Sequence, residues 1–229
     1  MPDTPNIGRT GIPQRKAYAP DLFLFDFDGT VADTLTISHS ILNDLAREFR
    51  FRTLPTEELQ QARLMGTREF IRHLGISSWR VPRIAHRGLL ELQNRITEVE
   101  PIAGIPAVLA ELHGRGHRIG ILTSNSETNV LAFIARNSLP YFHFVRTSSK
   151  LFGKARVMRK IVREEKTQPG RVIYVGDETR DIEAAREAGL RIAAVTWGYN
   201  AEETLAGLAP DHLLRSPGEL LGIGERATT

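Results

Sequence analysis

The hydrophobic pattern of the chain begins with an apolar run at 22–25 that leads directly into two acidic residues, Asp26 and Asp28. Gly29 and Thr30 follow them. A segment that is apolar at every position is typical of a strand buried on both faces of a parallel sheet. We therefore expect a strand at about 21–26 with two carboxylates at its carboxyl end. A strand that ends in an ordinary Asp-Gly turn would have the same pattern.

Residues 34–100 have a different, helical pattern. Apolar residues recur every three or four positions in three stretches, 37–49, 64–74 and 84–99, as they do on the buried face of a helix. We expect an all-helical insertion here, placed at the carboxyl end of the first strand. That is the end where open α/β sheets bind ligands, so the insertion is a candidate lid.

From residue 101 onward, short apolar runs alternate with helical patterns. The expected strands are 119–122, 142–145, 172–175, 192–195 and 212–214, and the expected helices are 105–112, 126–137, 154–166, 181–188 and a short one near 202. This alternation predicts an α/β fold with a doubly wound parallel, Rossmann-like sheet. The predicted divisions are a flexible lead-in at 1–20, an α/β core at 21–33 and 101–229, and a helical cap at 34–100.

The amino-acid composition excludes several classes of function. The chain has 229 residues, 41% of them hydrophobic, 25% charged and none of them cysteine. Disulfides, thiolate metal sites and a cysteine nucleophile are therefore excluded. We expect a cytoplasmic protein, because no apolar run approaches membrane-spanning length and the N-terminus does not resemble a signal peptide. The net charge of +3 is spread along the chain, so we expect no nucleic-acid or membrane partner, and an anionic small molecule as substrate.

A second acidic group follows the predicted strand at 172–175. Asp177, Glu178 and Asp181 lie within five residues, directly after Gly176. These carboxylates repel one another unless a cation is present. Since no His or Cys accompanies them, the ligand set suits a hard cation such as Mg²⁺. In the alternative interpretation Asp181 caps a helix and Glu178 is solvated, but Asp177 ends a buried strand and is harder to explain in that way.

Two further groups offer contacts for a phosphate. Thr123, Ser124 and Asn125 follow the predicted strand at 119–122, where hydroxyl and backbone N–H groups can hold a phosphate or can simply cap the next helix. Lys150 and Lys154 precede the helix that leads to the second acidic group. Lys154 stands at the helix start, where a cation opposes the helix dipole, so a functional role is more plausible for it than for Lys150.

Together these motifs resemble the haloacid-dehalogenase-like (HAD) hydrolase superfamily, in its phosphatase branch with a helical cap of the phosphoglycolate-phosphatase and β-phosphoglucomutase type. The resemblance covers residues 21 to about 215. The Asp-x-Asp-Gly-Thr motif corresponds to 26–30, the Ser/Thr motif to Thr123, the lysine to Lys154, and Gly-Asp-x-x-x-Asp to 176–181. The lysine departs from the frequent Lys-Pro pattern of the family.

The resemblance implies a Mg²⁺-dependent phosphomonoester hydrolase that acts on a small phosphorylated metabolite. Asp26 would be the nucleophile and would form an aspartyl-phosphate, and Asp28 would be the general acid and base. The metal would be held by Asp26, the Asp28 backbone carbonyl and Asp177, with Asp181 in support. The transferring phosphoryl oxygens would be stabilised by Thr123, Ser124 and Lys154, and we expect Asn125, next in the chain, to take part in this phosphate site.

Other functions remain open at this stage. A phosphomutase uses the same scaffold but needs a second phosphate site in the cap. A halide-releasing hydrolase lacks the second Asp, so Asp28 argues against it. A non-catalytic binding protein is disfavoured because no catalytic position is substituted. Arg68, in the inserted block, is a candidate substrate-specificity residue, although it and Arg72 also fit the surface of a helix.

Overall fold

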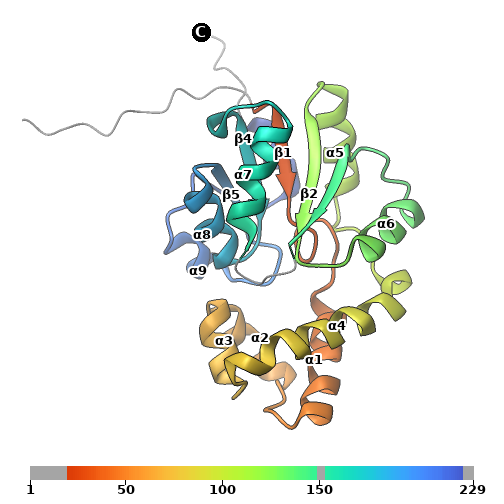
Figure 1. The fold of residues 1–229 in the computed structure, drawn as a ribbon, viewed down its shortest axis with the longest axis vertical. Helices are drawn as coiled ribbons and strands as arrows, with labels where there is room; N and C mark the ends of the chain where they lie inside the picture. Colours follow the sequence, from red (N-terminus) through yellow and green to blue (C-terminus); the bar gives the residue numbers. More distant parts are fainter. Residues whose placement is uncertain (1–19, 149–152, 224–229) are drawn as a thin grey trace, which may run out of the picture.

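A computed structural model describes residues 20–148 and 153–223, and its centre is a six-stranded parallel sheet in the order β3-β2-β1-β4-β5-β6 (Figure 1). The strands are β1 (Leu22–Phe25), β2 (Arg118–Thr123), β3 (Phe144–Thr147), β4 (Val172–Gly176), β5 (Arg191–Val195) and β6 (His212–Leu214). Phe25 is in register with Ile121 of β2 and Val175 of β4. The residues that follow these three strands therefore meet at one edge of the sheet. The predicted doubly wound α/β fold is confirmed.

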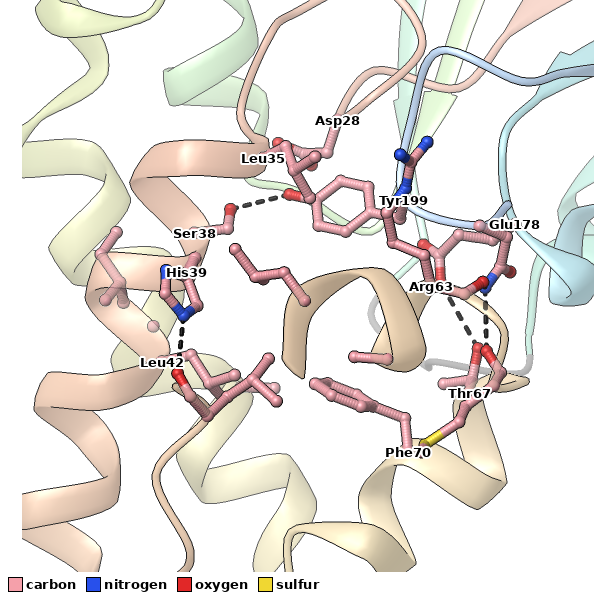
Figure 2. A pocket seen from close by; sticks show the side chains of 18 of the residues that line it. Asp28, Leu35, Ser38, His39, Leu42, Arg63, Thr67, Phe70, Glu178 and Tyr199 are labelled. Carbon is pink, nitrogen blue, oxygen red and sulfur yellow. Dashed lines mark hydrogen bonds between the residues drawn. The ribbon is translucent and has the colours of Figure 1, made fainter. Parts of the chain in front are cut away.

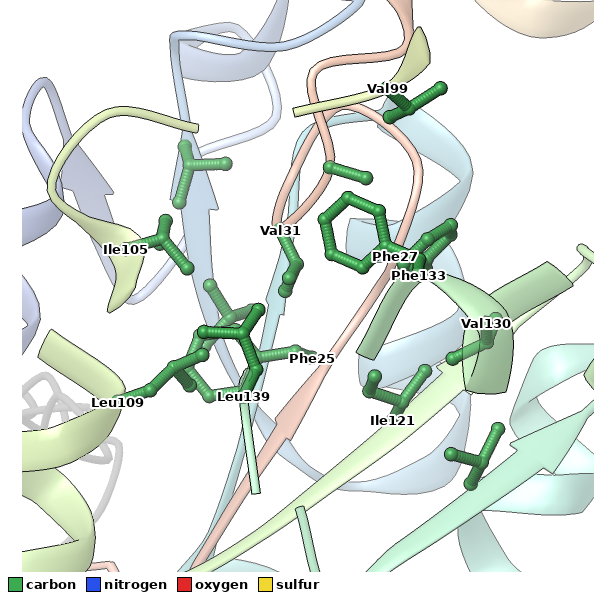
Figure 3. Close-up of a cluster of buried hydrophobic side chains, with 14 of the residues drawn as sticks. Phe25, Phe27, Val31, Val99, Ile105, Leu109, Ile121, Val130, Phe133 and Leu139 are labelled. Atoms are coloured by element: carbon green, nitrogen blue, oxygen red, sulfur yellow. The ribbon is translucent and has the colours of Figure 1, made fainter. Parts of the chain in front are cut away.

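Helices cover both faces of the sheet. They are α5 (Ile105–Gly114), α6 (Glu127–Arg136), α7 (Lys154–Glu164), α8 (Thr179–Ala188) and α9 (Glu202–Ala206), with short 3₁₀ turns η4 (Pro169–Arg171) and η5 (Pro217–Gly222). Alternate residues of β1 point to opposite faces. Phe23 and Phe25 join the cluster that includes α5 and α6 (Figure 3), whereas Leu22 and Leu24 join the cluster under α7 and α8. Both faces of β1 are thus buried, as its continuous apolar run predicts.

The regular elements between β1 and α5 are all helices or 3₁₀ turns. They are α1 (Leu35–Phe49), α2 (Leu59–Arg63), α3 (Thr67–His73) and α4 (Val81–Asn94), with the 3₁₀ turns η1 (Thr56–Glu58), η2 (Ser78–Arg80) and η3 (Ile96–Glu98). In Figure 1 this block lies below the sheet, beyond the carboxyl ends of the strands. Ile37, Ile41 and Leu45 form the buried stripe of α1, and α1 packs against α4.

In the α/β core the element boundaries differ from the predicted ones by up to two residues, whereas in the inserted block the predicted stretch 84–99 is divided into α4 and η3. β3 begins at Phe144 rather than at 142, because its ladder with β2 starts at the pair Gly120–Phe144. α7 ends at Glu164 instead of 166. α8 begins at Thr179 rather than Asp181, because Glu178 and Asp181 form a capping box that starts the helix earlier. No helix in the described ranges combines the length and apolarity needed to cross a bilayer.

Candidate active site

Three buried carboxylates converge at the shared edge of β1 and β4. Oxygens of Asp26, Asp177 and Asp181 all lie within 4.8 Å of one another, and the three residues are at most 2% exposed. Asp26 follows β1 directly, Asp177 follows β4 directly, and Asp181 lies in the first turn of α8. Residues far apart in the chain are thus brought together by the parallel pairing of β1 and β4.

Lys154 is the cation at the centre of this cluster. Its Nζ donates to Asp26 Oδ2 at 2.7 Å, to Asp181 Oδ1 at 2.8 Å and to the hydroxyl of Tyr174 at 2.9 Å. All three ammonium protons therefore have acceptors. The hydroxyl of Tyr174 in turn donates to the Leu122 carbonyl at 3.0 Å. These contacts explain why a lysine occupies the first position of α7, where it opposes the helix dipole. Lys150 lies outside the described residues.

Asp177 is held in place on both of its oxygens. The Thr30 hydroxyl donates to Oδ1 at 2.7 Å, and the Tyr199 backbone N–H donates to Oδ2 at 2.7 Å. Gly29 lies against this carboxylate with a φ of +73°, and a side chain at that position would collide with Asp177 and with the Tyr199 ring. The glycine of the first motif is thus required by its conformation and by the close approach of Asp177.

The cluster fits a divalent cation bound by oxygen ligands. Lys154 pairs with two of the three carboxylates, Asp26 and Asp181, so the group carries excess negative charge in a buried site. Burial raises the pKa of Asp177 well above its usual range, and the nearby charges of Glu178, Asp26 and Asp181 raise it further. A cation between Asp26 and Asp177 would relieve this repulsion, and the ligands are of the kind that Mg²⁺ prefers.

Asp28 is fixed by Asn125. The Asn125 side-chain nitrogen donates to both carboxylate oxygens of Asp28, at 3.1 Å each. The other end of the amide accepts from Ser126 N and Asn129 Nδ2, so its orientation is determined. Burial raises the pKa of Asp28 to about 6, while the hydrogen bond from Asn125 and the charges of Arg180 and Lys154 lower it. A carboxyl with this pKa can exchange protons near neutral pH.

Thr123 and Ser124 lie where the sequence places them, after β2. Thr123 is completely buried, and its hydroxyl oxygen accepts from Asn125 N at 2.9 Å. Ser124 is half-buried. Ser126 caps α6 by accepting from Asn129 N. Asn125 contacts Asp28 through its side chain, so any part that it has in phosphate binding stays a prediction.

A cavity of about 390 Å³ lies between the helical block and the edge of the sheet (Figure 2). Asp28, Arg180 and Tyr199 line it from the α/β core, and Arg63 and Thr67 line it from α2 and α3. The remaining wall is mainly apolar and includes Leu35, Leu42, Leu59, Phe70, Ile84 and Leu89. Asp28 thus connects the carboxylate cluster to the cavity under the helices.

The helical block contacts the core beside this cavity. The Asn200 side chain donates to the carbonyls of Arg63 and Met65 at 3.1 and 2.9 Å. The Arg63 guanidinium donates to the carbonyls of Thr196 and Gly198 at 3.2 and 3.1 Å. The junction of α2 and α3 therefore closes against the loop after β5.

Sequence reasoning assigned no role to three polar residues of the cavity, namely Arg63, Arg180 and Tyr199. Tyr199 donates to Ser38 Oγ at 2.7 Å (Figure 2). It also shares a hydrogen bond of 3.0 Å with Thr34. One interpretation of the sequence left Glu178 solvated. In the structure Glu178 pairs with Arg180 and accepts a hydrogen bond from Thr67 at 3.3 Å. The available signal was position, because Arg180 lies inside the Gly-Asp-x-x-x-Asp motif and Tyr199 lies just beyond a strand end. Arg68 lies on α3 and is exposed, outside the set of residues that line the cavity, so its role stays a prediction.

Comparison with known proteins places the chain in a family. Residues 23–195 match the family described as haloacid dehalogenase-like hydrolase. A curated relative from Synechococcus elongatus, named phosphoglycolate phosphatase, is 38% identical over 199 residues, covering 86% of this chain and 94% of the relative. An N-acetylmuramic acid 6-phosphate phosphatase from Pseudomonas aeruginosa is 26% identical over 89% of this chain and 94% of its own length.

A solved structure supports the fold assignment. The structure of a putative phosphoglycolate phosphatase from Lactobacillus plantarum superposes with a TM-score of 0.75 at 16% identity, covering 90% of this chain and 99% of the other. The prediction of a phosphoric monoester hydrolase is confirmed at the level of enzyme class. The chain belongs to the haloacid dehalogenase-like hydrolase family.

Proposed function

We propose that this enzyme is a Mg²⁺-dependent phosphatase that hydrolyses a small phosphorylated metabolite through an aspartyl-phosphate on Asp26. The observation that carries the proposal is the pair Asp26 and Asp28, two residues apart at the end of β1. Asp26 contacts the buried ammonium of Lys154, and Asp28 faces the cavity. One carboxylate can attack phosphorus while the other exchanges a proton with the leaving group.

The reaction then has two steps. A carboxylate oxygen of Asp26 attacks phosphorus, the bond from phosphorus to the ester oxygen breaks, and Asp28 gives its proton to the departing oxygen. In the second step Asp28 takes a proton from a water molecule, which attacks the aspartyl-phosphate and releases inorganic phosphate. The pKa of Asp28, raised to about 6 by burial, allows it to serve as acid and then as base.

The other residues of the site bind the phosphoryl group and a metal. Asp26 and Asp177 would hold Mg²⁺ through carboxylate oxygens, and Asp28 through its backbone carbonyl, with Asp181 in support. When bound, Mg²⁺ would offset the charge repulsion between the Asp26 carboxylate and an anionic phosphate. Thr123, Ser124, Asn125 and Lys154 would stabilise the phosphoryl oxygens.

The helical block at 34–100 would act as a cap that encloses the leaving group in the cavity. The name of the Synechococcus elongatus relative supports 2-phosphoglycolate as the first substrate to test. A cytoplasmic location stays a prediction.

The proposal is tested by measuring inorganic phosphate released from a panel of phosphorylated metabolites, with 2-phosphoglycolate among them, in Mg²⁺ and again after EDTA treatment. We expect Mg²⁺-dependent release from at least one small phosphomonoester and recovery of the activity when Mg²⁺ is restored. Release that is unchanged in metal-free buffer would contradict the metal assignment. The absence of release from every ester, p-nitrophenyl phosphate included, would contradict the proposed activity.

A further inference from the structure

Two arginines that line the cavity carry unpaired hydrogen-bond donors. Across residues 20–148 and 153–223, four buried side-chain polar atoms have no hydrogen-bond partner. Three of them are guanidinium nitrogens, namely Nε of Arg63 and both Nε and Nη1 of Arg180. Both arginines line the cavity, Arg63 from α2 and Arg180 from α8. Buried donors without acceptors destabilise a protein unless something else supplies the acceptor.

The position of Arg180 adds to the free-energy cost of its unpaired nitrogens. It is the second residue of α8, where a positive charge opposes the helix dipole. Its side chain is only 12% exposed, and its one ion pair is made through Nη2 with Glu178. The folded protein thus keeps a buried guanidinium at an unfavourable end of a helix with two of its nitrogens unused. An anionic ligand would satisfy these nitrogens.

The cavity lies on the leaving-group side of the reaction centre. Asp28, the residue that protonates the departing oxygen, lines the cavity, whereas Asp26, Thr123 and Lys154 do not. In the proposed mechanism the phosphoryl group binds to Asp26, Thr123 and Lys154. A substrate group that contacts Arg180 inside the cavity would therefore be part of the leaving alcohol. Since most of the remaining wall is apolar, an anion there depends on the arginines for its stabilisation.

We propose that Arg180 and Arg63 bind a carboxylate on the leaving group and are the residues that make the enzyme prefer phosphomonoesters of short hydroxy acids. This inference rests on the proposed function and specifies which residues select its substrate. Arg180 would contact the carboxylate from the core and Arg63 from the cap. Because Arg63 also donates to the carbonyls of Thr196 and Gly198, the substrate carboxylate would bind at the junction where the cap meets the core.

The first experiment uses the wild-type enzyme with Mg²⁺ and two substrates that differ only in charge. These are 2-phosphoglycolate and its neutral carboxamide, 2-phosphoglycolamide. We expect kcat/KM to be about tenfold to a hundredfold higher for the carboxylate, the range for a charge-assisted hydrogen bond in a buried site. Equal values, or a preference for the amide, would overturn the inference. If both substrates are hydrolysed equally well, the carboxylate site is contradicted but the proposed phosphatase activity is not. The two proposals can therefore fail separately.

Variants then assign the preference to residues. Arg180→Gln and Arg63→Met should each lower kcat/KM for 2-phosphoglycolate at least about tenfold more than for the amide. Arg180→Lys should recover only part of the difference, because it keeps the charge but not the planar donors. Arg163→Met removes an exposed arginine from α7 and should leave the ratio of the two substrates unchanged.

The outcomes separate this role from the alternatives. Equal losses on both substrates for Arg180→Gln would place Arg180 at the phosphoryl group or at Asp28, and would overturn the inference. Unchanged values for both arginine variants would also overturn it. If Arg180→Gln does not fold, as judged by circular dichroism, the wild-type comparison and the Arg63→Met ratio still decide the question.

Discussion

The side-chain amide of Asn125 lies 3.1 Å from each carboxylate oxygen of Asp28. It stabilises the charged form of the group that must donate a proton to the leaving group. Burial acts in the opposite direction and raises the pKa of Asp28 to about 6. The protonation state of the general acid is therefore set by a balance between desolvation, which raises its pKa, and the Asn125 amide together with the charges of Arg180 and Lys154, which lower it.

Removing this amide should change the pH dependence in a defined direction. Without the Asn125 hydrogen bonds, the charged form of Asp28 loses stabilisation, so its pKa rises further. The protonated acid then persists to higher pH, and the alkaline limb of the kcat/KM profile of Asn125→Ala should move to higher pH. The matched control is Asn137→Ala, which removes an amide from the other end of α6. A limb that stays in place, or moves to lower pH, would contradict this role of Asn125.

A substitution at Gly198 tests the metal site without removing any of its carboxylates. A Cβ at this position would overlap Oδ2, Cβ and Cγ of Asp177, whose other oxygen is held by Thr30. Gly198→Ala should therefore displace Asp177 and raise the Mg²⁺ concentration for half-maximal activity about tenfold to a hundredfold, as is typical when the residues supporting a metal ligand are changed. Gly170→Ala, where a Cβ meets open space, is the control. Equal Mg²⁺ titrations for both variants would exclude Asp177 as a ligand.

Lys154 should be essential for activity and for stability. Lys154→Met removes the ammonium that contacts Asp26 and Asp181 and leaves two buried carboxylates without their partner. We expect activity to fall far more than in Lys150→Met. The free energy of unfolding in metal-free buffer should fall by about 3–5 kcal/mol, as when one partner of a buried ion pair is removed. Phosphate release and urea denaturation measure the two effects. A larger loss of activity in Lys150→Met would reverse the choice of lysine.

Much of the fold could be predicted from the sequence because its signals are local. The apolar run of β1 and the alternation after residue 101 follow from burial on both faces of a parallel sheet. Gly189 ends α8 with a φ of +75°, as expected for a glycine after a helix. The boundary errors arose where a local pattern continues past the last hydrogen bond, as at the end of α7, or where side chains start a helix early, as Glu178 and Asp181 do for α8.

The site was predictable only in part, because only some of its residues are marked by local signals in the sequence. Asp26, Asp28, Asp177 and Lys154 each follow or begin an element, so topology brings them to one edge. Contacts that depend on how the cap docks on the core have no local signature. Arg63 is an unremarkable residue at the end of a short helix until α2 is placed against the loop after β5. Arg68 was a candidate only because of its place in the inserted block.

The most direct test of the account is the rate of phosphate release by Asp26→Asn, measured with Mg²⁺ on the best substrate of the wild-type enzyme. The substitution keeps the shape of the side chain and removes the nucleophilic oxygen charge. Circular dichroism should show a folded protein, and turnover should fall by about a thousandfold or more. Beryllium fluoride should form its adduct on Asp26 in the wild-type enzyme and not in the variant. Turnover within about tenfold of wild type, or an adduct on another residue, would contradict the assignment of Asp26 as the nucleophile.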